Sequence, residues 1–248
     1  MSERKIALVT GALGGIGSEI CRSLFQEGYK IIATVVPRKE AREIQWLKDE
    51  GFSQDDVRFV LGDLTNHEAM SAAITEAIEA EGRVDVLVNN AGVTRDATFK
   101  KMTYEQWSQV LDINLKTLFT VTQPVFNKML EQKSGRIVCI SSVNGVKGQF
   151  GQANYAATKA GMIGFAKSLA LEGARSGVTV NVVAPGYTAT PMVTAMREDV
   201  VKSIEAQIPA QRLATPEEIA AAVMYLVSDQ AGYVTGETLS VNGGLYMQ

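Results

Sequence analysis

Short apolar runs alternate along the chain with longer segments in which apolar residues recur at helical spacing. The runs predict buried strands at residues 5–10, 30–36, 57–61, 84–88, 136–141, 178–184 and 238–241. Helices are expected between them, including a long one from about 103 to 125, one that begins near 153 and one over 216–227. Strands that alternate with helices throughout predict a single α/β domain over residues 1–248, built on a doubly wound parallel sheet with helices on both faces.

A glycine-rich turn, Gly11–Gly17, follows the first predicted strand. Gly11, Gly15 and Gly17 let the backbone turn tightly and approach a pyrophosphate, whose charge would meet free N–H groups and the positive end of the next helix. Glycines also serve tight turns for steric reasons alone, so the pattern by itself is a weak signal. Its position between a strand and a helix predicts a dinucleotide-binding loop.

Tyr155 and Lys159 lie one helical turn apart in the helix that is predicted from residue 153. A phenol with its usual pKa of about 10 donates a proton poorly at neutral pH, and a neighbouring ammonium is expected to lower that pKa. Ser142 follows the strand at 136–141, at the carboxyl edge where such sheets bind ligands. A Tyr and a Lys at this spacing also occur by chance on many helices. The glycine-rich turn and Ser142 nevertheless favour Tyr155 as a general acid.

Together with the glycine-rich turn, Ser142, Tyr155 and Lys159 resemble the signature of the short-chain dehydrogenase/reductase family, and the resemblance runs from end to end. Asn89–Gly92 resembles the family's Asn-Asn-Ala-Gly motif, and Asn114 its fourth catalytic residue. The resemblance implies a Rossmann-type fold and a catalytic tetrad of Asn114, Ser142, Tyr155 and Lys159. It also implies hydride transfer from a nicotinamide to a carbonyl that Ser142 holds and Tyr155 protonates. Lys159 would bind the nicotinamide ribose, and Asn114 would help to hold a water that passes protons to this lysine.

The end of the strand at 30–36 bears on the choice of cofactor. Enzymes that prefer NAD usually carry an acidic residue here, whereas this chain continues with Pro37, Arg38 and Lys39. Two cations can hold a 2′-phosphate, which predicts NADPH, with Arg38 ahead of Lys39. The alternative is that both residues merely begin a solvated helix.

The other cofactor contacts follow from the glycine-rich turn and from the family resemblance. For Asp63 the family implies a contact with the adenine, and the alternative is that it caps the helix that begins near His67. Leu13 stands where many carrier-protein reductases have a basic residue. The full set of expected contacts is Gly11, Leu13, Gly15, Ile16, Gly17, Arg38, Asp63, Leu64, Asn90, Ala91, Gly92, Tyr155, Lys159, Pro185, Gly186 and Thr188.

Within the family, the chain resembles two groups of 3-ketoacyl thioester reductases. One reduces acetoacetyl-CoA to (R)-3-hydroxybutyryl-CoA for polyhydroxybutyrate synthesis, and the other reduces 3-oxoacyl-[acyl-carrier protein] in fatty-acid synthesis. The segment Val143–Gln152 resembles the first group, which favours CoA, although Phe150 could instead only pack the loop. A non-catalytic nucleotide-sensing or scaffold role is the less favoured alternative, because the four catalytic positions are intact. The expected substrate contacts are Asp96, Ser142, Gln149, Phe150, Gln152, Tyr155 and Tyr187, with a substrate lid at about 188–210.

Composition argues against several other classes. A net charge of -3 without a basic run disfavours nucleic-acid binding. No apolar run suits a signal peptide or a membrane span, which predicts a cytoplasmic enzyme. Cys21 and Cys139 lack CxxC spacing and are expected to be core thiols, and the single histidine, His67, excludes a histidine-rich metal site. The family resemblance suggests a homotetramer.

Overall fold

The computed structural model describes residues 4–37 and 42–247 and is built around one seven-stranded sheet. All of its strands are parallel, and their order across the sheet is β3-β2-β1-β4-β5-β6-β7. The order reverses between β1 and β4, as in doubly wound sheets, so the predicted fold class is confirmed. The strands are β1 (Ile6–Thr10), β2 (Lys30–Val35), β3 (Val57–Leu61), β4 (Val86–Asn89), β5 (Gly135–Ile140), β6 (Val178–Pro185) and β7 (Thr238–Val241).

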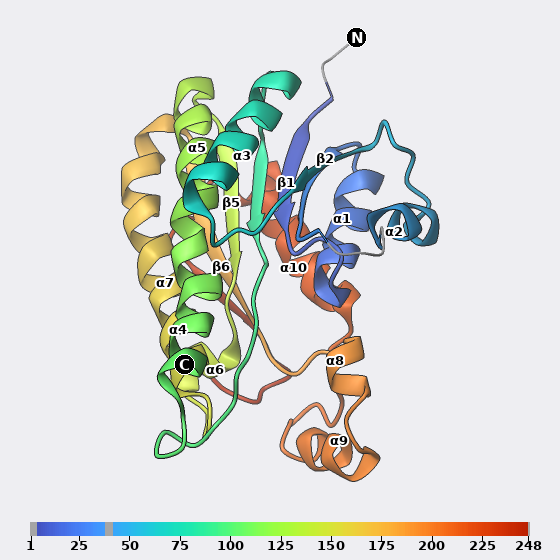
Figure 1. Ribbon diagram of the computed structural model, residues 1–248, viewed down its shortest axis with the longest axis vertical. Coiled ribbons are helices and arrows are strands. Elements are labelled where there is room, and N and C mark those ends of the chain that lie inside the picture. Colours follow the sequence, from blue (N-terminus) through green and yellow to red (C-terminus); the bar gives the residue numbers. More distant parts are fainter. Residues whose placement is uncertain (1–3, 38–41, 248) are drawn as a thin grey trace.

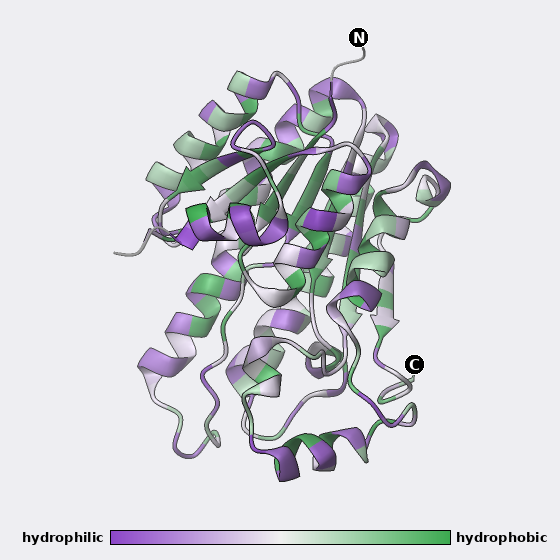
Figure 2. Ribbon diagram, turned by 90° about the vertical axis from the view of Figure 1, so that its right-hand side faces the viewer, coloured by the Kyte–Doolittle hydropathy of each residue, from purple (hydrophilic) through white to green (hydrophobic). Residues whose placement is uncertain are grey.

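Helices cover both faces of this sheet (Figure 1). One face carries α3 (His67–Glu81), α4 (Tyr104–Leu111), α5 (Thr117–Gln132) and α7 (Ala153–Gly173). The other face carries α1 (Gly15–Gln26), α2 (Arg42–Glu50) and α10 (Pro216–Val227). Because side chains alternate along a strand, each apolar strand serves two cores, and Figure 2 shows the hydrophobic strands enclosed between the helices.

The register of the central strands brings apolar side chains into rows that run across the sheet. Leu8 of β1 lies beside Ile32 and Leu87, and Leu87 lies beside Ile137. All four side chains are fully buried under the helices of the α5 face. Such continuous apolar packing fixes the register of neighbouring strands. The carboxyl ends of β1, β4, β5 and β6 therefore meet at one edge.

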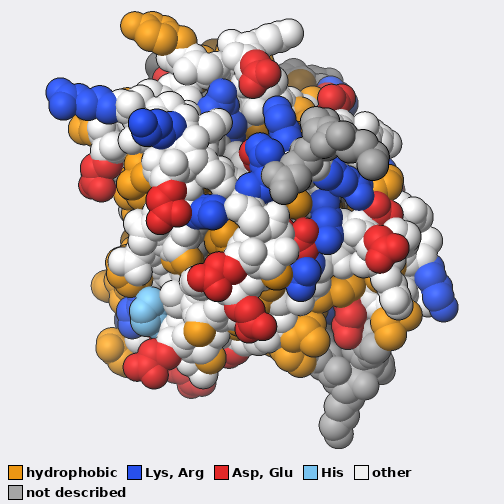
Figure 3. Space-filling model, turned by 90° about the horizontal axis from the view of Figure 1, so that it is seen from above, with side chains coloured by type: hydrophobic (Ala, Val, Ile, Leu, Met, Phe, Trp, Pro, Cys, Tyr) orange, Lys and Arg blue, Asp and Glu red, His pale blue; other side chains and the backbone are white. Residues whose placement is uncertain are grey.

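The opposite edge, where the strands begin, carries paired charges. Lys and Arg side chains lie among Asp and Glu side chains there (Figure 3). Lys30 and Arg58 both bind the carboxylate of Glu81, with N–O distances of 2.8 Å and 2.6 Å, and Arg4 binds Asp56 at 2.8 Å. These ion pairs join neighbouring strands to helix α3 and to the β2–β3 connection. These charges therefore help to hold the fold together at the edge where the strands begin.

Two predicted elements differ in the structure. The helix expected over 103–125 is interrupted by a π-helical segment, Asp112–Lys116, between α4 and α5. Its buried Asn114 directs its amide to other segments of the chain, and π-helical turns of this kind often occur at functional sites. The expected loop after Ser142 contains a short helix, α6 (Val143–Lys147), because the Ser142 hydroxyl accepts a hydrogen bond from the Asn144 N–H and caps it.

Residues 188–210, the predicted lid, contain two short helices, α8 (Pro191–Thr194) and α9 (Glu198–Glu205). Both lie beyond the carboxyl edge of the sheet, beside the end of β6 (Figure 1). Over residues 4–37 and 42–247, no helix combines the length and apolarity that crossing a bilayer requires. Cys21 and Cys139 are buried and unpaired, which confirms the prediction that both are core thiols.

Candidate active site

The glycine-rich turn forms the floor of the site at the carboxyl end of β1. Gly11 has a φ of +63°, a conformation that favours glycine. A Cβ on Gly17 would overlap the Gly11 carbonyl oxygen, so helix α1 packs too closely for any side chain at this position. Gly14 caps α1 without a side-chain hydrogen bond, and no acidic residue stands in the first helical turn. The N–H groups of this helix end are therefore left for an anion, and the loop fits the pyrophosphate of a dinucleotide.

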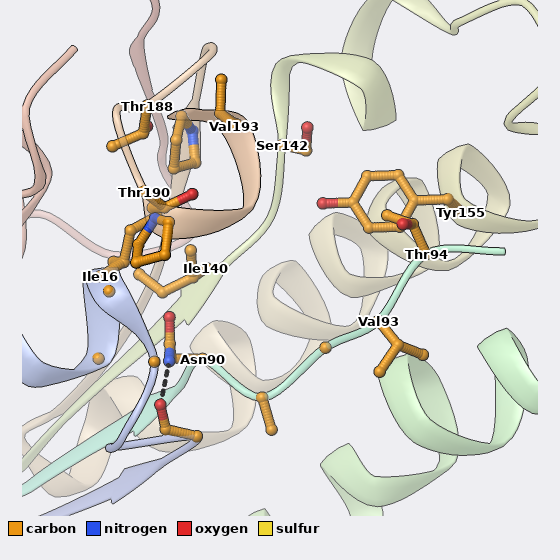
Figure 4. A pocket seen from close by; sticks show the side chains of 18 of the residues that line it. Ile16, Asn90, Val93, Thr94, Ile140, Ser142, Tyr155, Thr188, Thr190 and Val193 are labelled. Carbon is orange, nitrogen blue, oxygen red and sulfur yellow. Dashed lines mark hydrogen bonds between the residues drawn. The ribbon is translucent and has the colours of Figure 1, made fainter. Parts of the chain in front are cut away.

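The loop is held open by the first residues after β4. The backbone N–H groups of Asn90 and Ala91 both donate to the Thr10 hydroxyl at 3.0 Å, and the Asn90 amide donates to the carbonyls of Thr10 and Gly11 at 3.1 Å (Figure 4). These bonds tie the ends of β1 and β4 together at the point where strand order reverses. This is where doubly wound sheets bind their ligands.

A cavity of about 700 Å³ extends from this loop along the ends of β4, β5 and β6 to the segment after β6 (Figure 4). Most of the residues predicted from the sequence to contact cofactor or substrate line it. They are Gly11, Leu13, Gly15, Ile16, Gly17, Leu64, Asn90, Ala91, Gly92, Asp96, Ser142, Gln152, Tyr155, Lys159, Pro185, Gly186, Tyr187 and Thr188. Its volume and its mixed apolar and polar walls suit a dinucleotide with a small reacting group.

The side chains of Ser142 and Tyr155 lie near one another in the lining of this cavity (Figure 4). Ser142 lies between β5 and α6, whereas Tyr155 projects from the first turn of α7. Burial raises the pKa of Tyr155. The Ser142 hydroxyl opposes this shift and the charge of Asp96 adds to it. The predicted direction of this pKa shift was wrong, because removal of the phenol from water outweighs the effects of its neighbours.

Lys159 lies beneath Tyr155 and is only 3% exposed. Its ammonium donates a hydrogen bond of 2.7 Å to the Ile140 carbonyl and lies 5.6 Å from the centre of the Tyr155 ring. It therefore faces the ring and the end of β5. Burial lowers the pKa of Lys159 from 10.5 to about 8, so the amine still carries a proton at neutral pH.

Asn114, the fourth predicted catalytic residue, does not line the cavity but lies directly behind it. Its side-chain oxygen accepts from the Val93 N–H at 2.8 Å, and its amide donates to the Val93 carbonyl at 2.9 Å and to the Thr158 hydroxyl at 3.3 Å. A Cβ on Gly92 would lie 3.4 Å from the Asn114 oxygen and 3.5 Å from the Lys159 nitrogen. The side chain of Asn114 thus positions the chain after β4 against α7, close to Lys159.

Three predicted contacts are not brought into the cavity. Gln149 and Phe150 lie outside it, and the Phe150 side chain is 86% exposed. The positive φ angles of Gly148 and Gly151 turn this loop outward, and the Gln149 amide oxygen accepts from Lys147 instead. Asp63 accepts hydrogen bonds from Thr65 and does not line the cavity.

At the adenosine end of the cavity, the sequence left alternatives open for Asp63 and for Arg38 and Lys39, and the structure tests the first of them. Helix α3 is capped by the Asn66 side chain, so the alternative that Asp63 caps this helix is wrong. Arg38 and Lys39, the predicted 2′-phosphate ligands, lie outside the described residues.

Several cavity residues were not predicted from the sequence. Arg42, the first described residue of α2, lines the cavity near the ends of β2 and β3. The sequence shows that Arg42 is a cation, but its place beside the cavity depends on where helix α2 begins, which the sequence pattern does not fix. Asn144 also lines the cavity from α6, a helix that was predicted to be a loop. The others are Gly14, Thr34, Val35, Val36, Glu43, Gly62, Val93, Thr94, Ile140, Ser141 and Val143, together with Thr190, Pro191, Val193 and Met196 from the predicted lid.

Comparisons with known proteins agree with this geometry. The family model for short chain dehydrogenases matches residues 5–201. The acetoacetyl-CoA reductase of Acinetobacter sp. (strain RA3849) is 82% identical over 100% of both chains. The acetoacetyl-CoA reductase of Allochromatium vinosum is 48% identical over 98% of this chain and 99% of its own. The 3-oxoacyl-[acyl-carrier-protein] reductase of Salmonella typhimurium is 46% identical over 99% of this chain and 98% of its own. The chain therefore belongs to the short-chain dehydrogenase family, as its glycine-rich turn and its Ser142, Tyr155 and Lys159 predict.

Proposed function

We propose that this protein reduces acetoacetyl-CoA to (R)-3-hydroxybutyryl-CoA with NADPH, as a precursor for polyhydroxybutyrate. The observation that carries the proposal is the pair of neighbouring hydroxyl-bearing side chains, Ser142 and Tyr155, in the lining of a cavity that begins at a dinucleotide loop. The choice of substrate is supported by 82% identity, over the whole chain, to an acetoacetyl-CoA reductase.

The chemistry follows from the protonation states of the side chains. A bound nicotinamide supplies the hydride. Ser142 accepts a hydrogen bond from the Asn144 N–H, so its own proton is free to bind the substrate carbonyl. Tyr155 keeps its proton at neutral pH because burial raises its pKa, and it releases this proton to the far more basic alkoxide. The ammonium of Lys159 beneath the ring stabilises the tyrosinate that remains.

The segment after β6 covers the mouth of this site. Thr190 and Pro191 contact Gly15 closely, since a Cβ on that glycine would lie 3.1 Å from each. Val193 and Met196 line the cavity from the same segment. Residues 188–210 act as the lid that excludes water from the hydride transfer.

A nicotinamide cofactor follows from the family, and its 2′-phosphate form is part of the proposal. Strand β2 ends at Val35, and the two described residues that follow it, Val36 and Pro37, carry no carboxylate to accept ribose hydroxyls. Arg42 lines the adenosine end of the cavity together with Glu43. A guanidinium here can bind a phosphate through two N–H groups, and this supports NADPH.

Replacing Arg42 with alanine tests the cofactor preference. The loss of a charged hydrogen bond is worth about 1.5–3 kcal/mol, so the KM for NADPH should rise roughly 10- to 100-fold. The KM for NADH should change less than about threefold, because NADH lacks the phosphate. Lys48→Ala, on an exposed position of the same helix away from the cavity, is the matched control. Equal effects of Arg42→Ala on both cofactors would exclude Arg42 as a phosphate ligand.

A second function, reduction of 3-oxoacyl-[acyl-carrier protein], is favoured by one observation, the 46% identity over nearly the full chain to such a reductase. Both carriers present the same acyl thioester arm to the cavity. They differ in what lies outside it.

The two functions are separated by steady-state oxidation of NADPH with acetoacetyl-CoA and with acetoacetyl-acyl-carrier protein, compared as kcat/KM. A preference for the CoA ester of about 100-fold or more, equal to roughly 3 kcal/mol in the transition state, is expected. A higher kcat/KM for the carrier-protein substrate would instead assign the enzyme to fatty-acid synthesis. The proposed roles of Ser142 and Tyr155 would stay the same. No turnover with either thioester, despite tight NADPH binding, would favour a non-catalytic nucleotide-sensing role.

A further inference from the structure

Three polar side chains form a hydrogen-bonded chain along the substrate side of the cavity. The Gln152 amide nitrogen donates to the Asp96 carboxylate at 2.8 Å, and the Asn144 amide nitrogen donates to the Gln152 oxygen at 2.9 Å. We call this chain the amide bridge. It joins the segment after β4, the start of α7 and helix α6, and all three residues line the cavity.

Asp96 determines the order of hydrogen-bond donors and acceptors along the amide bridge. An ionised carboxylate only accepts hydrogen bonds, so Gln152 must turn its NH₂ group towards Asp96 and its oxygen towards Asn144. Asn144 must then turn its own NH₂ group towards Gln152. The side-chain oxygen of Asn144 is left on the other side, buried and without a hydrogen-bond partner in the described part of the chain.

An unpaired buried oxygen is costly, by about 1–3 kcal/mol. Asn144 is only 7% exposed, so solvent does not compensate for this cost. The side chain keeps this orientation because the carboxylate at the far end of the bridge holds it. Buried polar groups without partners are rare and often belong to functional sites, so the bridge points to a role beyond packing.

The backbone of Asn144 connects the bridge to the reacting groups. Its N–H donates to the Ser142 hydroxyl oxygen at 3.1 Å and so determines where the Ser142 proton can point. Helix α6 has only five residues and is followed by Gly148, which has a φ of +76°. A helix this short has little stability of its own, so contacts from outside must hold it in place.

We propose that Gln152 is a positioning residue: through the amide bridge it fixes helix α6, and thereby directs the Ser142 hydroxyl towards the carbonyl that Tyr155 protonates. This role in orienting Ser142 adds to the substrate contacts that the sequence predicts for Gln152 and Asp96. The kinetic readout of this inference rests on the proposed function.

Gln152→Met removes both hydrogen bonds of the bridge and keeps the length of the side chain. The kcat for acetoacetyl-CoA reduction should fall about tenfold or more, the equivalent of 1.4 kcal/mol. The dissociation constant for NADPH should stay within about twofold, since Gln152 lies on the substrate side. Gln109→Met is the matched control. Gln109 also makes a side-chain hydrogen bond to the segment after β4, to Arg95 next to Asp96, but this bond is exposed to solvent. An undiminished kcat in Gln152→Met, or an equal loss in Gln109→Met, would overturn the proposal.

A rescue experiment separates the bridge from a general packing effect. Gln152→Glu places a second carboxylate against Asp96 and should impair kcat at least as strongly as Gln152→Met. Adding Asp96→Asn to this variant rebuilds the bridge with the negative charge at position 152 instead of position 96. The new amide at position 96 donates to the new carboxylate at position 152. That carboxylate still accepts a hydrogen bond from Asn144. The double variant should have a kcat about tenfold higher than that of Gln152→Glu. The single variant Asp96→Asn is measured as well, because a double-mutant cycle requires both single variants. A double variant no better than Gln152→Glu would refute the bridge.

Hydrogen exchange provides a readout that needs no substrate. The backbone amides of residues 143–148 should exchange about tenfold faster in Gln152→Met and return towards the wild-type rate in the double variant. Unchanged exchange in Gln152→Met would overturn the bridge even if activity fell. If the wild-type protein turned over neither thioester, the proposed function would fail, and exchange would still decide the role of Gln152.

Discussion

Replacing Tyr155 with phenylalanine is expected to lower kcat by about 10³-fold, because it removes the hydroxyl group that, in the proposed mechanism, gives its proton to the alkoxide formed in the cavity. The ring, and with it the contact to the Lys159 ammonium, is retained. The dissociation constant for NADPH should therefore stay within about threefold. Single-turnover reduction of acetoacetyl-CoA, with cofactor binding followed by fluorescence, measures both quantities.

The control for this variant is Tyr225→Phe. Tyr225 stands on α10, is about half exposed and lies outside the cavity. It should retain wild-type activity and stability. If Tyr155→Phe kept more than about a tenth of the wild-type kcat, another group would have to supply the proton. In that case the Ser142 hydroxyl would be the next candidate, since it also lines the cavity and lies near Tyr155.

Gly17→Ala is expected to weaken NADPH binding by about 100-fold or more and to lower the free energy of unfolding. The added Cβ would overlap the Gly11 carbonyl oxygen and would lie 3.0 Å from the Gly11 carbonyl carbon and 2.8 Å from the Asn90 amide nitrogen. Backbone atoms cannot yield without moving the turn itself, and that turn presents the N–H groups that would bind the pyrophosphate. Isothermal titration with NADPH and thermal unfolding measure the two effects.

Gly164→Ala is the matched control, because a Cβ at this position in α7 meets no atom within 4 Å. Alanine is the better helix former by about 1 kcal/mol, so this control should be as stable as the wild type or more so. Normal NADPH affinity in Gly17→Ala would support the alternative from the sequence, that these glycines serve only to make a tight turn.

The parts of the fold that were predictable are those in which one local pattern decides the outcome. The strand Val57–Leu61 and the helix Pro216–Val227 have the predicted bounds. The helix is marked by Thr215, Pro216 and Glu218, which form a capping box with a proline in the first turn. Seven apolar runs separated by helices then leave few arrangements other than a doubly wound sheet.

The unpredicted parts depend on contacts between distant segments. The π-helical segment around Asn114 reflects hydrogen bonds to Val93 and Thr158, which a helical pattern cannot reveal. Phe150 was expected in the acyl pocket, but two glycines in left-handed conformations turn its loop outward. The pKa of Tyr155 was expected to fall because its neighbours were known and the extent of its burial was not.

The same limit applies to cofactor selection and to the amide bridge. Arg42 is one of many cations in the sequence, and only the fold places it beside the cavity. Asn144 carries no motif, and its partners Gln152 and Asp96 come from two other segments. Their directional hydrogen bonds arise only when the ends of β4 and β5 have met.

The buried ammonium of Lys159 has a consequence for how the protein folds. Its pKa falls from 10.5 to about 8, so at neutral pH this group lowers the free energy of unfolding by about 3 kcal/mol. Because the unfolded chain holds this proton more tightly, the loss is complete below pH 8 and disappears as the pH rises towards 10.5. Selection for stability alone would favour an apolar side chain here. In the proposed mechanism, Lys159 therefore marks a position where the chain gives up thermal stability in favour of turnover, and the rest of the fold must be stable enough to tolerate this loss.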